Sequence, residues 1–295
     1  MKYQNNFDLI RLFASLQVAF SHAVWHLNIK EEWILWLQKA LSFFPGVPIF
    51  FFISGFLVYQ SFNRNQTNPL NYYRNRALRI FPALIAAAFV CLALLIFSRP
   101  ELFEHNKTEV ITWFVGQISL FQFYTPDALR FWGVGTPNGS LWTISVELQF
   151  YLILPLLVIL LKSSLKFVKL VVLILVCIGF NYYSASAFYA DGILGKALGV
   201  SLSSYLFFFL LGIIGAVYKD KIIPFVLKYG LFIVLSFASL VFSSLFWGEV
   251  NIGGYWITSI ENLIYYILLC LLVFIVAFKT RLQKLTNKLN SHDIS

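Results

Sequence analysis

An arginine and a histidine inside the first apolar stretch of the chain are the residues best suited to chemistry. Arg11 and His22 are eleven positions apart within 7–27, a stretch otherwise rich in Leu, Ile, Phe, Ala and Val. At about 100° and 1.5 Å per residue they share one helical face, about 16 Å apart along the axis. Such a polar stripe is costly in lipid, so we expect it to face a protein interior or a water-filled cavity. The stripe also includes, within about 60° of the same line, Asp8, Ser15 and His26.

Proton transfer is the chemistry that this stripe suggests. The neutral imidazole of His22 is able to accept a proton from a hydroxyl near neutral pH, as a general base does; the alternative is a hydrogen-bonded histidine of the core. Glu147 is the second candidate, because its carboxylate would orient His22 and stabilise the imidazolium formed during transfer. The alternative for Glu147 is a structural partner of Arg11 or of a backbone donor. Glu261 is a further intramembrane acid, and nothing in the sequence connects it to the stripe.

The elements that must position these residues are membrane helices. Of the 295 residues, 59% are hydrophobic and 12% charged, and the mean hydropathy is +0.77. Repeated apolar runs of about twenty residues then predict an all-α, polytopic transmembrane helical bundle of about eight or nine segments. The three cysteines all lie in apolar runs and show no metal or disulfide spacing, so we expect small core side chains and no metal site: Cys91, Cys177 and Cys270.

The charges are arranged as in a membrane protein. With the N-terminus inside, most of the 22 Lys and Arg residues fall in inside loops and most of the 13 acids fall outside. The net charge of +9 therefore indicates a membrane surface, with lipid and not nucleic acid as the partner. This orientation requires 110–124 to be re-entrant; if that stretch crossed, the later basic clusters would change sides. The predicted spans are 7–27, 41–61, 77–98, 139–161, 167–184, 198–217, 222–246 and 255–278.

Two further segments are unusual. Arg74, Arg76 and Arg79 form a basic patch where the chain re-enters the membrane from the inside. This patch is either a positive-inside anchor or a phosphate clamp, since arginine forks match phosphate oxygens. The segment from Gly46 to Leu57 contains Pro48 and Gly55, and its glycine would let another helix approach closely.

Together these segments resemble the acyltransferase family 3 membrane proteins, which include O-antigen and other surface-glycan acetylases. The resemblance covers the first half of the chain, to about residue 160. It rests on four blocks in the family's order: Phe7-Asp8-Leu9-Ile10-Arg11 followed by His22, Gly46 to Leu57, Arg76-Ala-Leu-Arg79-Ile-Phe-Pro82, and Leu141-Trp-Thr-Ile-Ser-Val-Glu147-Leu-Gln-Phe-Tyr151.

The resemblance implies a membrane-bound O-acyltransferase of the bacterial inner membrane, with its N-terminus in the cytoplasm. An acyl-CoA donor, most simply acetyl-CoA, would bind from inside, and a surface carbohydrate or lipid-linked glycan would accept the acyl group outside. His22 would act as general base or acyl relay, with Glu147 and Arg11. The residues expected to bind the donor are Arg74, Arg76, Arg79, Ser54 and Gly55, and those expected to bind the acceptor are Asp8, His26, Trp142 and Tyr151.

The C-terminal end departs from the family pattern. The family continues into further membrane helices at about the point where this sequence ends, Ser291-His-Asp-Ile-Ser295. We therefore expect residues 1–295 to form a single membrane domain without its C-terminal helices, whose uncovered flank would favour a homo-oligomer. Two alternatives stay open: a transporter whose Arg11, His22 and Glu147 form a proton pathway, and an inactive truncated remnant.

Overall fold

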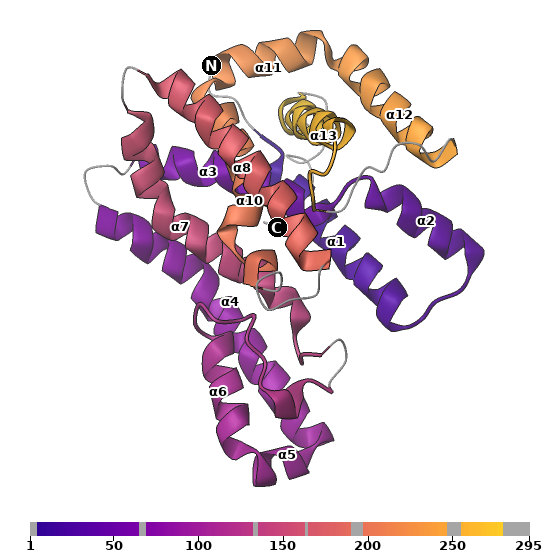
Figure 1. Ribbon diagram of the computed structural model, residues 1–295, viewed down its shortest axis with the longest axis vertical. Helices are drawn as coiled ribbons and strands as arrows, with labels where there is room; N and C mark the ends of the chain where they lie inside the picture. Colours follow the sequence, from indigo (N-terminus) through magenta and orange to yellow (C-terminus); the bar gives the residue numbers. More distant parts are fainter. Residues whose placement is uncertain are drawn as a thin grey trace, which may run out of the picture. The chain divides into compact units, whose positions relative to one another are not determined.

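The structure is a computed structural model, and it describes residues 5–64, 69–131, 135–162, 165–189, 197–246 and 255–279. These residues form helices and turns, with no extended strand among the helices in Figure 1. Seven of the described helices are long and apolar enough to cross a membrane, and a bent pair would make eight. A helix satisfies its own backbone hydrogen bonds, which lipid cannot do. The prediction of an all-α, polytopic helical protein is confirmed.

The chain divides into two compact units. The first comprises the described residues within Met1–Tyr59, Val176–Ser186 and Tyr205–Ser295, and the second those within Gln60–Leu175 and Ala187–Ser204. The first unit contains, in whole or in large part, α1 (Phe7–His26), α2 (Glu32–Ser42), α3 (Gly46–Arg64), α10 (Leu202–Val217), α11 (Lys219–Lys228), α12 (Gly230–Phe246) and α13 (Ile260–Phe278). The second contains α4 (Pro69–Ser98), α5 (Pro100–His105), α6 (Lys107–Gln117), η1 (Asp127–Leu129), η2 (Gly139–Leu141), α7 (Trp142–Leu161) and the start of α8 (Lys166–Tyr189).

The core of the first unit is built on a close crossing of α3 and α10. A Cβ atom at Gly55 would lie 2.1 Å from the carbonyl oxygen of Phe209, and one at Gly212 would lie 2.1 Å from that of Phe52. Only glycine permits this approach, as is common where helices pack in membranes. Stacked aromatic rings extend the contact, with 4.7 Å between the ring centroids of Phe51 and Phe209.

The N-terminal helix α1 is anchored to this core at its start and near its middle. At its start, the Asn6 amide donates to the Ala277 carbonyl at 2.9 Å, which satisfies one of the last carbonyls of α13. Further along, the buried Gln17 side chain accepts a 3.0 Å hydrogen bond from the Gly46 amide at the start of α3. These contacts fix which face of α1 is turned inward.

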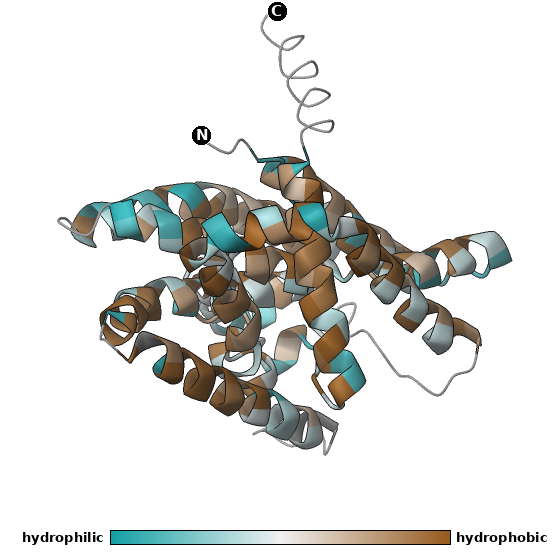
Figure 2. Cartoon of the chain, turned by 90° about the horizontal axis from the view of Figure 1, so that it is seen from above, coloured by the Kyte–Doolittle hydropathy of each residue, from teal (hydrophilic) through white to brown (hydrophobic). Residues whose placement is uncertain are grey.

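The second unit is organised by α4, whose 30 residues span about 45 Å. Its C-terminal part packs against α5 and α6, which lie beside it at the lower end of Figure 1. Leu95, Val110, Trp113 and Leu129 form a buried cluster there that holds η1 against the helices. Brown predominates along the helices in Figure 2, as expected where large apolar side chains face lipid.

Three predicted segments need comment. The predicted span 222–246 consists of two helices, α11 and α12, which are bent by 76° at the break between Lys228 and Gly230 and form a broken span or a re-entrant loop. The polar content of α11 and the missing Cβ at Gly230 explain the break, since neither favours a continuous apolar helix. The predicted span 41–61 lies within the candidate span Glu32–Arg64: its first two residues end α2, and α3 begins at Gly46, directly after Pro45. The stretch 110–124 contains the last part of α6, whose 11 residues extend about 16 Å, too short to cross a bilayer, and the chain then turns.

Candidate functional site

The polar stripe of α1 lies away from the face that packs in the first unit. The inward face consists of Phe7, Ile10, Ala14, Gln17 and Val24, all buried. The stripe residues Asp8, Ser15, His22 and His26 are exposed, and the Arg11 side chain is 17% exposed. The shared helical face predicted for these residues is therefore present, and it points out of its unit.

Charges and rings are paired within this stripe. Arg11 lies 3.9 Å from the Asp8 carboxylate, one turn before it on the helix. The rings of His22 and His26 contact edge-on, with centroids 5.8 Å apart. Asp8 thus gives Arg11 a partner on its own helix, while His22 keeps an exposed imidazole. The catalytic role of His22 and the acceptor-binding roles of Asp8 and His26 stay predictions.

Ser54 and Gly55 lie at the α3 crossing. Ser54 is buried, and Gly55 contacts the backbone of α10 so closely that no side chain would fit. The structure thus gives Gly55 a role in helix packing, and donor binding by these two residues stays a prediction. Pro48 falls in the first turn of α3, where its missing N–H breaks no hydrogen bond of the helix.

The basic patch of α4 divides between two helical faces. Arg76 and Arg79 are three residues apart and therefore neighbours on the helix surface. Arg74 is exposed and lies about 200° around the helix from Arg76. Arg76 is half-buried, and its Nη2 donates to Ser61 Oγ at 3.3 Å. The arginines most able to bind one ligand together are thus Arg76 and Arg79.

Tyr151 joins this patch to Glu147. Its hydroxyl donates to Glu147 Oε1 one turn earlier on α7, and the Arg76 guanidinium lies 5.8 Å from its ring centroid, as in a cation–π contact. Arg79 follows Arg76 by one turn on α4. The structure therefore brings together Arg76, Arg79, Glu147 and Tyr151, four residues predicted for two different roles. Trp142 begins α7, five residues before Glu147.

One buried group in this cluster has an unused hydrogen bond. Arg76 Nε has no hydrogen-bond partner among the described residues, although it is buried. Leaving a buried donor unsatisfied costs about 1–3 kcal/mol, more for a charged group. An oxygen of an anionic ligand would satisfy it, and exposed Arg79 beside it would add a second positive charge.

Sequence reasoning missed two residues that build this cluster. Ser61 accepts from Arg76, and the Tyr72 hydroxyl donates to the Tyr151 carbonyl at 3.2 Å, holding α4 against α7. Tyr72 precedes Arg76 by four residues, so helical spacing placed it on the same face.

Glu261 has a structural role. It is exposed in the first turn of α13, where the helix dipole stabilises a carboxylate.

These features define a multi-pass membrane protein with an arginine pair beside a tyrosine–glutamate contact. The profile of acyltransferase family 3, described as "Acyltransferase domain", matches residues 4–290, and the chain belongs to this family. The predicted family is therefore confirmed.

Three relatives illustrate the similarity. Nodulation protein 10 of Rhizobium leguminosarum bv. viciae is 39% identical over 172 residues, covering 52% of this chain and 44% of that protein. The peptidoglycan O-acetyltransferase OatA of Listeria monocytogenes is 28% identical over 60% of this chain and 28% of its own length. The O-acetyltransferase OatA of Staphylococcus aureus is 26% identical over 56% of this chain and 26% of its own length. The chain thus spans less than half of these relatives. No solved structure is significantly similar to it.

Proposed function

We propose that this chain transfers an acetyl group from cytoplasmic acetyl-CoA to a hydroxyl of a surface carbohydrate or lipid-linked glycan across the bacterial inner membrane. Membership of acyltransferase family 3 and the similarity to two O-acetyltransferases support this reaction class. The observation that supports binding of the acetyl-CoA donor is the buried, unsatisfied Nε of Arg76 beside exposed Arg79. An arginine pair of this kind suits the phosphates of CoA.

In the proposed reaction each residue has one role. Arg76 and Arg79 bind donor phosphates at the inner side, and Tyr151, held by Glu147, keeps its ring against the Arg76 guanidinium. His22 takes the proton of the acceptor hydroxyl, and the hydroxyl oxygen attacks the thioester carbonyl. The carbon–sulfur bond breaks, and the CoA thiolate leaves and takes up a proton. In the relay variant of this proposal, the imidazole nitrogen attacks the thioester carbonyl and the CoA thiolate leaves; the acceptor hydroxyl oxygen then takes the acyl group, and its proton passes to the released imidazole.

The test is transfer of radiolabelled acetyl groups from acetyl-CoA in proteoliposomes, with binding of acetyl-CoA measured on the same samples. We expect His22→Ala to abolish transfer and leave donor affinity within about twofold, because its exposed imidazole is not needed for packing. His105→Ala, an exposed histidine of α5, is the matched control and should transfer normally. Equal transfer by His22→Ala and the control would refute the role of His22. Wild-type protein that binds no acetyl-CoA would refute the proposed function.

A further inference from the structure

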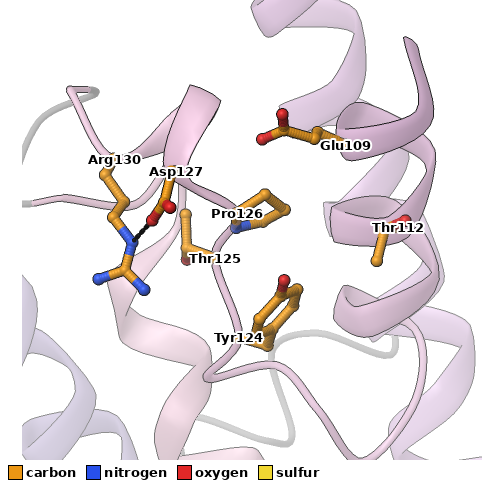
Figure 3. A pocket seen from close by; sticks show the side chains of 7 residues that line it. All are labelled: Glu109, Thr112, Tyr124, Thr125, Pro126, Asp127 and Arg130. Atoms are coloured by element: carbon orange, nitrogen blue, oxygen red, sulfur yellow. Dashed lines mark ion pairs between the residues drawn. The ribbon is translucent and has the colours of Figure 1, made fainter. Parts of the chain in front are cut away.

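A polar pocket lies in the second unit, at the far end of α4 from the arginine pair. Its volume is about 380 Å³, within the range of small-molecule sites, about 300–1,000 Å³. Figure 3 shows Glu109 and Thr112 of α6 on one side and the segment 124–130 on the other. The lining residues are Glu109, Thr112, Tyr124, Thr125, Pro126, Asp127 and Arg130.

The walls of this pocket are fixed by the fold. Leu129, completely buried in the cluster around Trp113, anchors the segment 124–130. The Ala128 amide donates to Glu109 Oε2 at 3.0 Å, which joins that segment to α6. The pocket is therefore part of the folded unit, and its two walls are joined before any ligand binds.

One lining hydroxyl is available to a ligand. Thr125 is only 7% exposed, lines the pocket, and makes no hydrogen bond with any other described residue. Its hydroxyl oxygen is accessible from the pocket and is therefore able to donate a hydrogen bond to a ligand or accept one from it. Beside it, the Tyr124 ring is 47% exposed and offers an apolar face at the pocket wall.

The charges of the pocket select the kind of ligand. Two carboxylates and one guanidinium line it, so anions are disfavoured. Each carboxylate is also engaged, Glu109 by the Ala128 amide and Asp127 by Arg130 at 2.8 Å, which weakens the attraction for a metal cation. The lining therefore offers hydrogen-bond acceptors, hydrogen-bond donors and hydroxyl groups around the aromatic face of Tyr124. A neutral ring bearing many hydroxyls, which both donate and accept, fits this lining.

The position of the pocket matches an acceptor that arrives from the opposite side to the donor. From Arg79 to Ser98, α4 runs 19 residues, about 28 Å, close to the hydrocarbon thickness of a bilayer. The helices α5 and α6 follow directly, so the pocket and the arginine pair lie toward opposite membrane faces. We infer that this pocket binds a neutral carbohydrate; its role as the acceptor subsite rests on the proposed function.

The test measures glycan binding apart from acyl transfer. The full chain in nanodiscs is titrated, by ligand-observed NMR, with neutral oligosaccharides such as oligomers of glucose and of N-acetylglucosamine, and with a hexuronate oligomer as the anionic comparison. We expect the neutral probes to bind and the anionic one not to bind. Thr125→Val combined with Glu109→Gln, which keeps an acceptor for Ala128, should weaken binding about tenfold or more. Tyr124→Ala, at an exposed position, is an independent variant with the same expected direction.

The control is Glu104→Gln, an exposed glutamate of α5 outside the pocket, which should bind as wild type does. Binding that is unchanged in both pocket variants, or absent in wild type for every neutral probe, would overturn the inference. Glycan binding that depends on the pocket, without acetyl transfer, would support the subsite and refute the proposed function. Acetyl transfer with a KM for glycan that is unchanged in the variants would support the proposed function and refute the subsite.

Discussion

Under the proposed function, Arg76 and Arg79 of α4 should contribute unequally to acetyl-CoA binding. Arg76 is half-buried, with Nη2 on Ser61 and Nε unsatisfied, whereas Arg79 is exposed. A hydrogen bond to a charged group contributes about 1.5–3 kcal/mol. Since about 1.4 kcal/mol is a factor of ten, Arg76→Ala should weaken acetyl-CoA binding about 10- to 100-fold. Arg79→Ala should weaken it less than about fivefold, as exposed charges do.

Salt separates these two contributions. The Debye length falls from about 8 Å at 0.15 M ionic strength to about 3 Å at 1 M, which screens exposed charges much more than buried ones. The loss from Arg79→Ala should therefore vanish at 1 M NaCl, while the loss from Arg76→Ala persists. Arg76→Lys keeps the charge but not the planar fork, and we expect it to recover only part of the affinity.

The assay is calorimetric titration of detergent-purified protein with acetyl-CoA at both salt concentrations. Arg64→Ala, which removes an exposed arginine at the end of α3, controls for net charge. Melting temperatures without ligand control for folding, because the Arg76 guanidinium also contacts the Tyr151 ring. Affinity of Arg76→Ala equal to that of the Arg64→Ala control, or a loss that disappears at high salt, would refute the reasoning.

Three further predictions test packing and polarity. Tyr151→Phe removes the hydroxyl bound to the neighbouring carboxylate and should cost about 1–2 kcal/mol of unfolding free energy in detergent denaturation, with donor affinity nearly unchanged. Gly55→Ala should lower the free energy of unfolding by at least about 1–3 kcal/mol, whereas Gly179→Ala, inside α8 and with nothing within 4 Å of its Cβ, should melt no lower than wild type. In membranes, a water-soluble maleimide should label Ser15→Cys but not the apolar neighbour Leu16→Cys; equal labelling would contradict a wet polar face.

The sequence predicted the helices well because apolar length is a local property. The first span, 7–27, agrees with α1 within one residue, since its apolar run ends where polar residues begin. The break between α11 and α12 was missed, although polar Lys219–Lys228 and Gly230 signalled it. A hydropathy average over 222–246 hides such a bend, because the apolar residues of α12 outweigh one polar turn.

The site was predicted in its parts and not in its assembly. Helical spacing placed Arg76 beside Arg79, and Tyr151 one turn from Glu147. That α4 packs on α7, so that these two pairs meet, depends on contacts between residues 79 positions apart, such as Tyr72 with Tyr151. Spacing along the sequence carries no such information, and the polar pocket near α6 was missed for the same reason.

The outward polar face of α1 limits where this helix is able to lie in a membrane. A charged residue at the centre of a spanning helix costs about 2.5–3.5 kcal/mol on insertion scales. Asp8 offsets part of this cost for Arg11, but only at 3.9 Å and near the helix end, and the two histidines contact only each other and Trp25 among the rings described. Four of the five stripe residues are exposed on one side of α1. A face of this polarity requires water or polar protein groups opposite it, which is also what a hydroxyl acceptor and its general base require.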